Sequence, residues 1–335
     1  MAKHFYIYSP SGAVRDKAGF KRGLAFLKKQ GHEVEVDQAA LASQQRFAGD
    51  DATRVAAIHR AAASGADVAL ISRGGYGLTR ILQDINYRAI AKAIDKGTHF
   101  VGMSDFTALQ LALLQKTGSV SWAGPALCEG FGTRVDSSAQ NKDTEGHAES
   151  GQTGPHGQGG PDDIMLACFN DLLLGQGEGC GWRQNRETTQ AGAQAGVQYA
   201  IELHNTQLWG GNLSVLCNLV GTPWLPAIQG GVLFLEDVAE HPYRVERMLT
   251  QLLNAGILAK QKAVILGQFN HYKLTPHDRG FKLQSVVDWL RCRVKTPVLT
   301  NLPYGHVPTK VLLPVGAQVD LVVEGRDVMM AWGHL

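Results

Sequence analysis

Ser104 has the side chain and the setting that nucleophilic acyl transfer needs. It stands where the apolar run 99–103 meets a second apolar segment, 106–114, so we expect a buried strand, a sharp corner and an amphipathic helix. Such a corner holds a hydroxyl out of the fold, beside the unpaired N–H groups and the positive dipole end of the helix. These are the surroundings of a nucleophile whose attack creates an oxyanion.

The local sequence leaves a second interpretation of Ser104 open. A nucleophile elbow has a glycine two residues before and two residues after the serine. Gly102 fits this pattern, whereas Phe106 stands at the second position. Ser104 could equally be a helix N-cap with Asp105 in the first turn, and caps are much commoner than nucleophiles. The spacing alone favours the cap.

A serine nucleophile also needs a histidine base and a carboxylate that orients the histidine. Glu236 ends the apolar strand expected at 232–235, where an acid is costly unless it has a partner. His306 follows a Pro-Tyr-Gly turn just beyond another expected strand. The chain has 12 histidines and 30 acids, so an ordinary strand-end carboxylate and an ordinary loop histidine remain open alternatives.

The segment Arg73–Gly77 reads Arg-Gly-Gly-Tyr-Gly. Glycines let backbone N–H groups approach a ligand closely, but they are also the usual residues of tight turns. The segment lacks the Gly-x-Gly-x-x-Gly order and the Lys-Ser/Thr pair of nucleotide-binding loops. We therefore expect a plain turn or an oxyanion-binding backbone.

The elements that position these residues alternate between strand and helix. Strands are expected at 5–8, 33–36, 68–71, 99–103 and 120–122, with helices around 17–30, 50–65, 78–82 and 106–114 between them. This alternation predicts an α/β domain whose parallel sheet is flanked by helices on both faces. Ligands of such sheets bind at the carboxyl ends of the strands, where Ser9–Gly12, Arg73–Gly77 and Ser104 all fall.

The second half of the chain predicts a smaller α/β domain. Residues 133–162 are polar and Gly-rich, which indicates a linker or surface insertion. A helix at 162–174 and an irregular segment at 175–196 follow. We divide the chain into an N-terminal α/β domain with the nucleophile (1–130), an insertion with one helix and a linker (131–197), and a C-terminal domain with Glu236 and His306 (198–335).

Composition excludes several classes of function. The net charge of +2 gives no reason to expect a nucleic-acid partner. The five cysteines are widely spaced and form no Cys-x-x-Cys pair, so neither a disulfide framework nor a zinc site is indicated. The N-terminus runs directly into a strand and no apolar segment is long enough to span a bilayer. We expect a cytoplasmic protein without metal, cofactor or membrane partner.

Ordered motifs along nearly the whole chain resemble those of one family, the LD-carboxypeptidases or muramoyl-tetrapeptide carboxypeptidases, which also includes the microcin C self-immunity peptidases. The motifs are Ser-Pro-Ser-Gly at 9–12, Arg-Gly-Gly-Tyr-Gly at 73–77, Gly-Met-Ser-Asp-Phe-Thr at 102–107, Gly-Pro at 124–125, Leu-Trp-Gly-Gly-Asn-Leu-Ser at 208–214, Gly-Thr-Pro-Trp at 221–224, Leu-Glu-Asp-Val-Ala-Glu-His-Pro-Tyr-Arg-Val-Glu-Arg at 235–247, Gly-His at 305–306 and Leu-Pro-Val-Gly at 313–316. Only residues 133–200 fall outside the resemblance.

The resemblance implies a catalytic triad of Ser104, Glu236 and His306. It also implies an oxyanion hole from the backbone N–H groups of Gly74, Gly75 and Asp105, in a site between the two domains. The family's reaction removes the terminal D-Ala from muropeptide tetrapeptides through an acyl-enzyme, without a cofactor. A homodimer is implied as well, whereas the identity of the diamino acid before D-Ala is not.

The contacts to substrate are less defined than the triad. Arg73 could bind a free carboxylate or pair with an acid in the fold. Trp209 and Asn212 could contact substrate, although a tryptophan in an apolar segment is more often part of the core. The long insertion and the lack of a glycine shortly before Leu208 depart from the family pattern.

Two other functions stay open: hydrolysis of an aminoacyl-nucleotide antibiotic, as in self-immunity, and ligand binding without catalysis. The self-immunity enzymes usually carry an aromatic residue in the insertion region to stack on the base. Residues 133–162 contain no aromatic residue, which disfavours that function.

Overall fold

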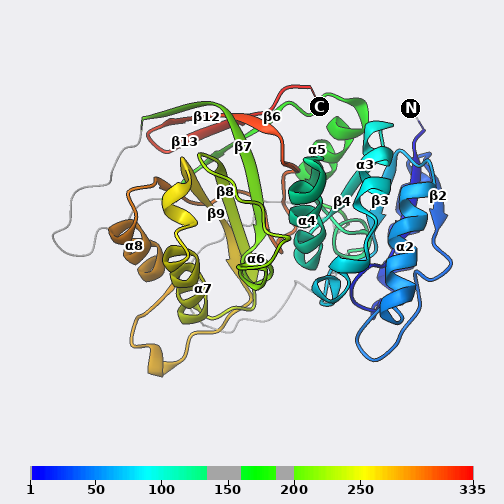
Figure 1. Cartoon of the computed structure of the whole chain (residues 1–335), viewed down its shortest axis with the longest axis horizontal. Helices are drawn as coiled ribbons and strands as arrows, with labels where there is room; N and C mark the ends of the chain where they lie inside the picture. The colour runs from blue at the N-terminus through cyan, green and yellow to red at the C-terminus, as the bar shows by residue number, and fades with distance from the viewer. Residues whose placement is uncertain (1, 134–159, 186–199, 335) are drawn as a thin grey trace.

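Two sheets lie side by side in the computed structural model, which describes residues 2–133, 160–185 and 200–334 (Figure 1). The first sheet has six strands in the order β11-β5-β4-β3-β1-β2, and the second has seven in the order β10-β9-β8-β7-β12-β13-β6. The expected α/β class, with parallel strands flanked by helices, is confirmed.

The first sheet is parallel except at one edge. Its parallel strands are β1 (His4–Tyr8), β2 (Glu33–Val36), β3 (Val68–Ile71), β4 (His99–Gly102) and β5 (Ser121–Ala123). The edge strand β11 (Leu313–Val315) pairs antiparallel with β5 and comes from the C-terminal part of the chain. The two halves of the chain are therefore joined by a shared sheet.

Helices cover both faces of this sheet, as the alternation of elements predicted. One face packs on α1 (Lys17–Lys29) and α5 (Asp163–Leu174). The other packs on α2 (Asp51–Ala63), α3 (Tyr87–Asp95) and α4 (Thr107–Thr117). Strands of continuous Val, Ile, Leu and Ala residues, such as β3, are typical of a sheet buried on both faces.

The second sheet combines a parallel and an antiparallel part. The parallel strands are β7 (Ile201–Asn212), β8 (Val232–Val238), β9 (Ala263–Asn270) and β10 (Val298–Leu299). The antiparallel strands are β12 (Gln318–Glu324), β13 (Asp327–Ala331) and β6 (Gly179–Arg183). The helices α6 (Leu213–Leu219), α7 (Pro242–Asn254) and α8 (Leu283–Arg293) complete this half.

Two expected elements differ in the structure. A helix through Leu78 and Leu82 was expected, but the chain forms two 3₁₀ turns, Leu78–Arg80 and Leu82–Asp84, and the α-helix begins only at Tyr87 behind the cap Asn86. The segment 175–196 was expected to be irregular, yet β6 lies within it. Its Gly-rich sequence carries no strand signal, and pairing with β13 supplies the order.

Helix α4 is not amphipathic, because it lies between the two sheets (Figure 1). Every residue from Thr107 to Leu114 is buried. One side of the helix packs on the first sheet, and the other packs on β7 and α6. The helix after Ser104 therefore sits in a core shared by both halves, rather than at the surface.

Most of the polar insertion, residues 134–159, lies outside the described residues, as do residues 186–199. The helix expected at 162–174 is confirmed as α5. Among the described residues, no helix is both long and apolar enough to cross a membrane.

The first prediction concerns the packing at the end of β4. A Cβ on Gly102 would lie 2.6 Å from Cδ1 of Phe106 and 2.8 Å from Cδ1 of Ile71, both buried. We expect Gly102→Ala to lower the free energy of unfolding by about 1–3 kcal/mol through overpacking, as measured by urea denaturation. The control Gly177→Ala, whose new Cβ would have no neighbour closer than 3.5 Å, should not lower stability. Equal stability of both variants would show that the corner tolerates more volume.

Candidate active site

Ser104 stands at a strained corner between β4 and α4. The backbone is extended at Met103 and turns left-handed at Ser104, with φ of 62°. A non-glycine residue rarely adopts this conformation, and it persists only where the surroundings enforce it. The Ser104 side chain makes no capping hydrogen bond; Ser104 instead begins a 3₁₀ turn (Ser104–Phe106) that leads into α4. The N-cap interpretation is therefore wrong.

The glycine loop after β3 packs directly on Ser104. A Cβ on Gly74 would lie 2.7 Å from Cβ and 2.9 Å from Oγ of Ser104, so only glycine fits there. The carbonyl of Gly74 accepts from the N–H of Gly12 at 3.2 Å. The loops after β1, β3 and β4 thus meet at the carboxyl edge of the first sheet, as expected.

The N–H groups proposed for the oxyanion hole lie beside Ser104. Gly74 and Gly75 belong to the loop that packs on it, and Asp105 is in the first turn after it, where N–H groups have no acceptor within the helix. The carboxylate of Asp105 is buried and accepts from the N–H of Leu78 at 2.9 Å. This bond ties the residue after the serine to the end of the glycine loop.

Glu236 and His306 are brought together from positions 70 residues apart. Glu236 is fully buried at the end of β8, and its Oε2 lies 2.8 Å from Nδ1 of His306. Gly305 has φ of 144°, and a Cβ on it would lie 3.3 Å from the same carboxylate oxygen. Asn270 donates to the carbonyl of His306 at 2.7 Å. The histidine is thus oriented through Nδ1, with Nε2 left for proton exchange.

The charges of the site favour the protonated imidazole. Burial disfavours the imidazolium, but the hydrogen bond and charge of Glu236 outweigh it, with smaller effects from Glu129 and Asp237. The pKa of His306 is therefore raised above its ordinary value. Burial, followed by the neighbouring Glu236 charge, raises the pKa of Asp237 to about 6.

Asn212 lies in this network. Its Nδ2 donates to Oε1 of Glu236 at 3.1 Å and to Oδ1 of Asp237 at 3.0 Å, and the residue is 3% exposed. Its N–H donates to Oγ1 of Thr107 at 3.0 Å. Asn212 thus contacts the acid of the site, and its expected contact with substrate stays a prediction.

Asp237 and Thr107 were not singled out from the sequence. Two adjacent acids at the end of a buried strand were a usable signal for Asp237, because both need partners. Thr107 gave no signal, since its partner is 105 residues away.

Trp209 does not reach a surface. It is 1% exposed, and its indole N–H donates to Oε1 of Gln261 at 3.0 Å. The expectation that it contacts substrate does not agree with this placement.

Arg73 lies at the edge of the site and has two partners. Its guanidinium donates to the carbonyl of Ala13 at 3.2 Å and forms a long ion pair of 3.7 Å with Glu129. Pairing with an acid, one of the two alternatives, is therefore found. The pair is partly exposed.

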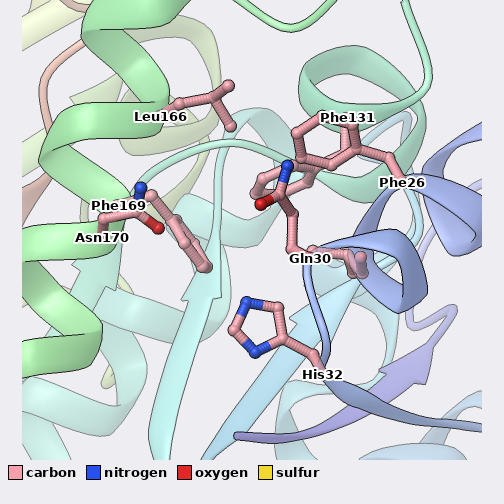
Figure 2. Close-up of a pocket in the computed structure, with 8 residues that line it drawn as sticks. Phe26, Gln30, His32, Phe131, Leu166, Phe169 and Asn170 are labelled. Atoms are coloured by element: carbon pink, nitrogen blue, oxygen red, sulfur yellow. The ribbon is translucent and has the colours of Figure 1, made fainter. Parts of the chain in front are cut away.

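A small cavity lies elsewhere, between α1, α5 and the turn Leu127–Phe131 (Figure 2). Phe131 and Phe169 line it together with Gln30 and His32. Its volume of about 50 Å³ is far below that of a typical ligand pocket. It contains none of the predicted site residues.

Comparison with known proteins identifies the family of the chain. A family model described as the LD-carboxypeptidase N-terminal domain matches residues 6–124, and one described as the C-terminal domain matches residues 205–321. The crystal structure of a muramoyltetrapeptide carboxypeptidase from Oxalobacter formigenes matches with a TM-score of 0.80 at 34% identity, covering 98% of each chain.

More distant relatives match over similar lengths. The probable murein peptide carboxypeptidase of Bacillus subtilis is 27% identical, over 92% of this chain and 86% of its own. The microcin C7 self-immunity protein MccF of Escherichia coli is 23% identical, over 99% of this chain and 93% of its own. A structure of MccF with glutamyl sulfamoyl guanosine shares the fold, with a TM-score of 0.79 at 20% identity, covering 100% of this chain and 97% of that one. The chain therefore belongs to the LD-carboxypeptidase family and is a carboxypeptidase hydrolase.

Proposed function

We propose that this protein is a serine carboxypeptidase that removes the terminal D-Ala from muramoyl tetrapeptides in peptidoglycan recycling. It cuts the bond between the L-centre of the diamino acid and D-Ala. The observation that carries the proposal is the 2.8 Å contact between His306 and the buried Glu236, in a chain whose other half presents Ser104 in a left-handed corner. The muramoyltetrapeptide carboxypeptidase from Oxalobacter formigenes, similar over nearly the whole chain, supports the substrate class.

Each residue has a defined part in the proposed reaction. Nε2 of His306 takes the proton of Ser104 as Oγ attacks the scissile carbonyl carbon, and Glu236 stabilises the resulting imidazolium. The N–H groups of Gly74, Gly75 and Asp105 bind the oxyanion. The C–N bond then breaks, and His306 gives its proton to the amine of the departing D-Ala. An ester between Ser104 and the shortened peptide remains.

Water completes the cycle. The water oxygen attacks the ester carbon while His306 takes a proton from the water. The C–O bond to Ser104 then breaks, and His306 returns the proton to Oγ of Ser104. The products are free D-Ala and a tripeptide with a new carboxylate. The family resemblance further suggests that the enzyme works in the cytoplasm as a homodimer.

Replacement of the nucleophile tests the proposal directly. We expect Ser104→Ala to abolish D-Ala release from tetrapeptides ending in diaminopimelate-D-Ala or Lys-D-Ala, and we expect a chelator to leave the wild-type rate unchanged. D-Ala released by the purified protein is measured by chromatography of the reaction mixture. Release by Ser104→Ala at the wild-type rate would remove Ser104 from its role.

The same experiment distinguishes the carboxypeptidase reaction from the self-immunity reaction. Absence of D-Ala release by the wild type, together with Ser104-dependent hydrolysis of an aminoacyl-sulfamoyl adenosine, would favour the self-immunity reaction. The similarity to MccF over the full chain is the observation that keeps this outcome in view.

The pH dependence tests the roles of His306 and Glu236. The base acts in its neutral form, so kcat/KM should rise as pH passes upward through the raised pKa of His306. In Glu236→Gln the anion that favours the imidazolium is lost. The pKa of His306 therefore falls, the acidic limb moves to lower pH, and the plateau drops about 10³- to 10⁴-fold.

Glu202→Gln is the matched control for this pH experiment. Glu202 contacts another histidine, the exposed His204, at 3.1 Å in the second sheet. Its replacement should change neither the limb nor the plateau. A limb that stays in place in Glu236→Gln would contradict the assigned pair.

Arg73 is proposed to bind the carboxylate of the terminal D-Ala. Loss of one charged hydrogen-bond donor predicts that Arg73→Gln raises KM about 10- to 100-fold, with a smaller effect on kcat. With a substrate whose C-terminus is amidated, the wild type and Arg73→Gln should have the same KM. Glu129→Gln removes the ion-pair partner of Arg73 and leaves the charge of Arg73 in place. It should keep KM within about threefold of the wild-type value. Equal effects of both variants would instead assign Arg73 a structural role.

A further inference from the structure

A buried hydrogen bond between the domains joins the two halves of the site. Oγ1 of Thr107, in the first turn of α4, accepts from the N–H of Asn212 at the end of β7, at 3.0 Å. Thr107 is 1% exposed and Asn212 is 3% exposed. Thr107 lies three residues after Ser104 on the same short stretch of helix.

Close packing between Gly211 and Thr107 also holds the end of β7 against the start of α4. Gly211 has φ of 134°, and a Cβ on it would lie 2.5 Å from Oγ1 and 2.8 Å from Cγ2 of Thr107. No side chain other than hydrogen fits between the strand end and the threonine. The hydroxyl and the methyl of Thr107 therefore both pack against the backbone of the second domain.

From Asn212 the contacts continue to the base. The Asn212 amide donates to Oε1 of Glu236, and Oε2 of Glu236 lies 2.8 Å from His306. A continuous line of contacts thus runs from the start of α4, next to the nucleophile, to the histidine. Strand β11 also joins the halves, but it pairs with β5 at the sheet edge and makes none of these contacts.

We propose that Thr107 is a positioning residue that sets the placement of Ser104 relative to His306, by holding the start of α4 against Asn212 and Gly211. The inference rests on the proposed serine mechanism. Thr107 touches neither substrate nor reacting atoms in this role. It acts through the alignment of two groups carried by different domains, where a misplacement of about 1 Å reduces a rate about 100-fold.

The test replaces the hydroxyl with a methyl of similar size. In Thr107→Val the N–H of Asn212 loses its acceptor, and we expect kcat for D-Ala release to fall about 10- to 100-fold while KM stays within about twofold. Thr107→Ser keeps the acceptor, and kcat should remain within about threefold of the wild type. All kinetic constants are calculated per mole of folded protein, and the folded fraction is measured by circular dichroism. If Thr107→Val does not fold, Thr107→Ala lacks the same acceptor and carries the same expectation.

Thr117 offers a matched control on the same helix. Its Oγ1 donates to the carbonyl of Leu113 at 2.7 Å and contacts Oγ of Ser119, within the first domain. Thr117→Val thus removes a threonine hydroxyl from α4 without affecting the contact to β7. Its kcat and KM should equal those of the wild type.

The inference is overturned by an unchanged kcat in Thr107→Val, by an equal loss in Thr107→Ser or by an equal loss in Thr117→Val. A loss expressed in KM alone would also count against it, because misalignment acts on the chemical step. Failure of the proposed function is separate, since it would appear as retained activity in Ser104→Ala. If Ser104→Ala is inactive and Thr107→Val is fully active, only the inference fails.

Discussion

The buried carboxylate of Glu236 is the constraint on which the site depends. A carboxylate with no solvent exposure is strongly unfavourable unless donors surround it. Its donors come from separate parts of the chain: the amide of Asn212 at the end of β7 and Nδ1 of His306 in the loop before β11. Satisfying this acid therefore requires two strand ends and a distant loop to meet. The same requirement orients the imidazole, so the stability of this half and the geometry of the base have one physical origin.

The other half of the site uses buried charge in a similar way. Arg54 is fully buried in α2, and its guanidinium donates to the carbonyls of Pro10 and Gly77 at 3.3 and 2.8 Å. The carboxylate of Asp105 accepts from the N–H of Leu78, the residue after the loop, at 2.9 Å. The glycine loop is thus fixed at its end by a cation and an anion. Glycine supplies the close approach to Ser104, whereas the charges supply the rigidity that an oxyanion site requires.

Local chemistry determined what the sequence could predict. The corner at Ser104, the acid at the end of β8 and the alternation of strands and helices all leave signals within a few residues, and the structure contains each of these elements. Long-range partners leave no such signal. Strand β6 exists because β13 pairs with it, and the buried indole of Trp209 bonds to Gln261, which is 52 residues away. Catalytic roles came from the family resemblance, because spacing alone favoured a cap for Ser104.

The error about α4 shows why a split active site resists local prediction. An amphipathic pattern assumes one face toward a core and one toward water. Helix α4 has a core on both sides, because β7 and α6 cover the face that would otherwise be exposed. Its burial from Thr107 to Leu114 gives the corner that carries the nucleophile a closely packed support. The corner that carries the nucleophile, just before this helix, and the loop that carries the base can therefore be held in register by packing, with polar contacts such as that of Thr107 setting the final alignment.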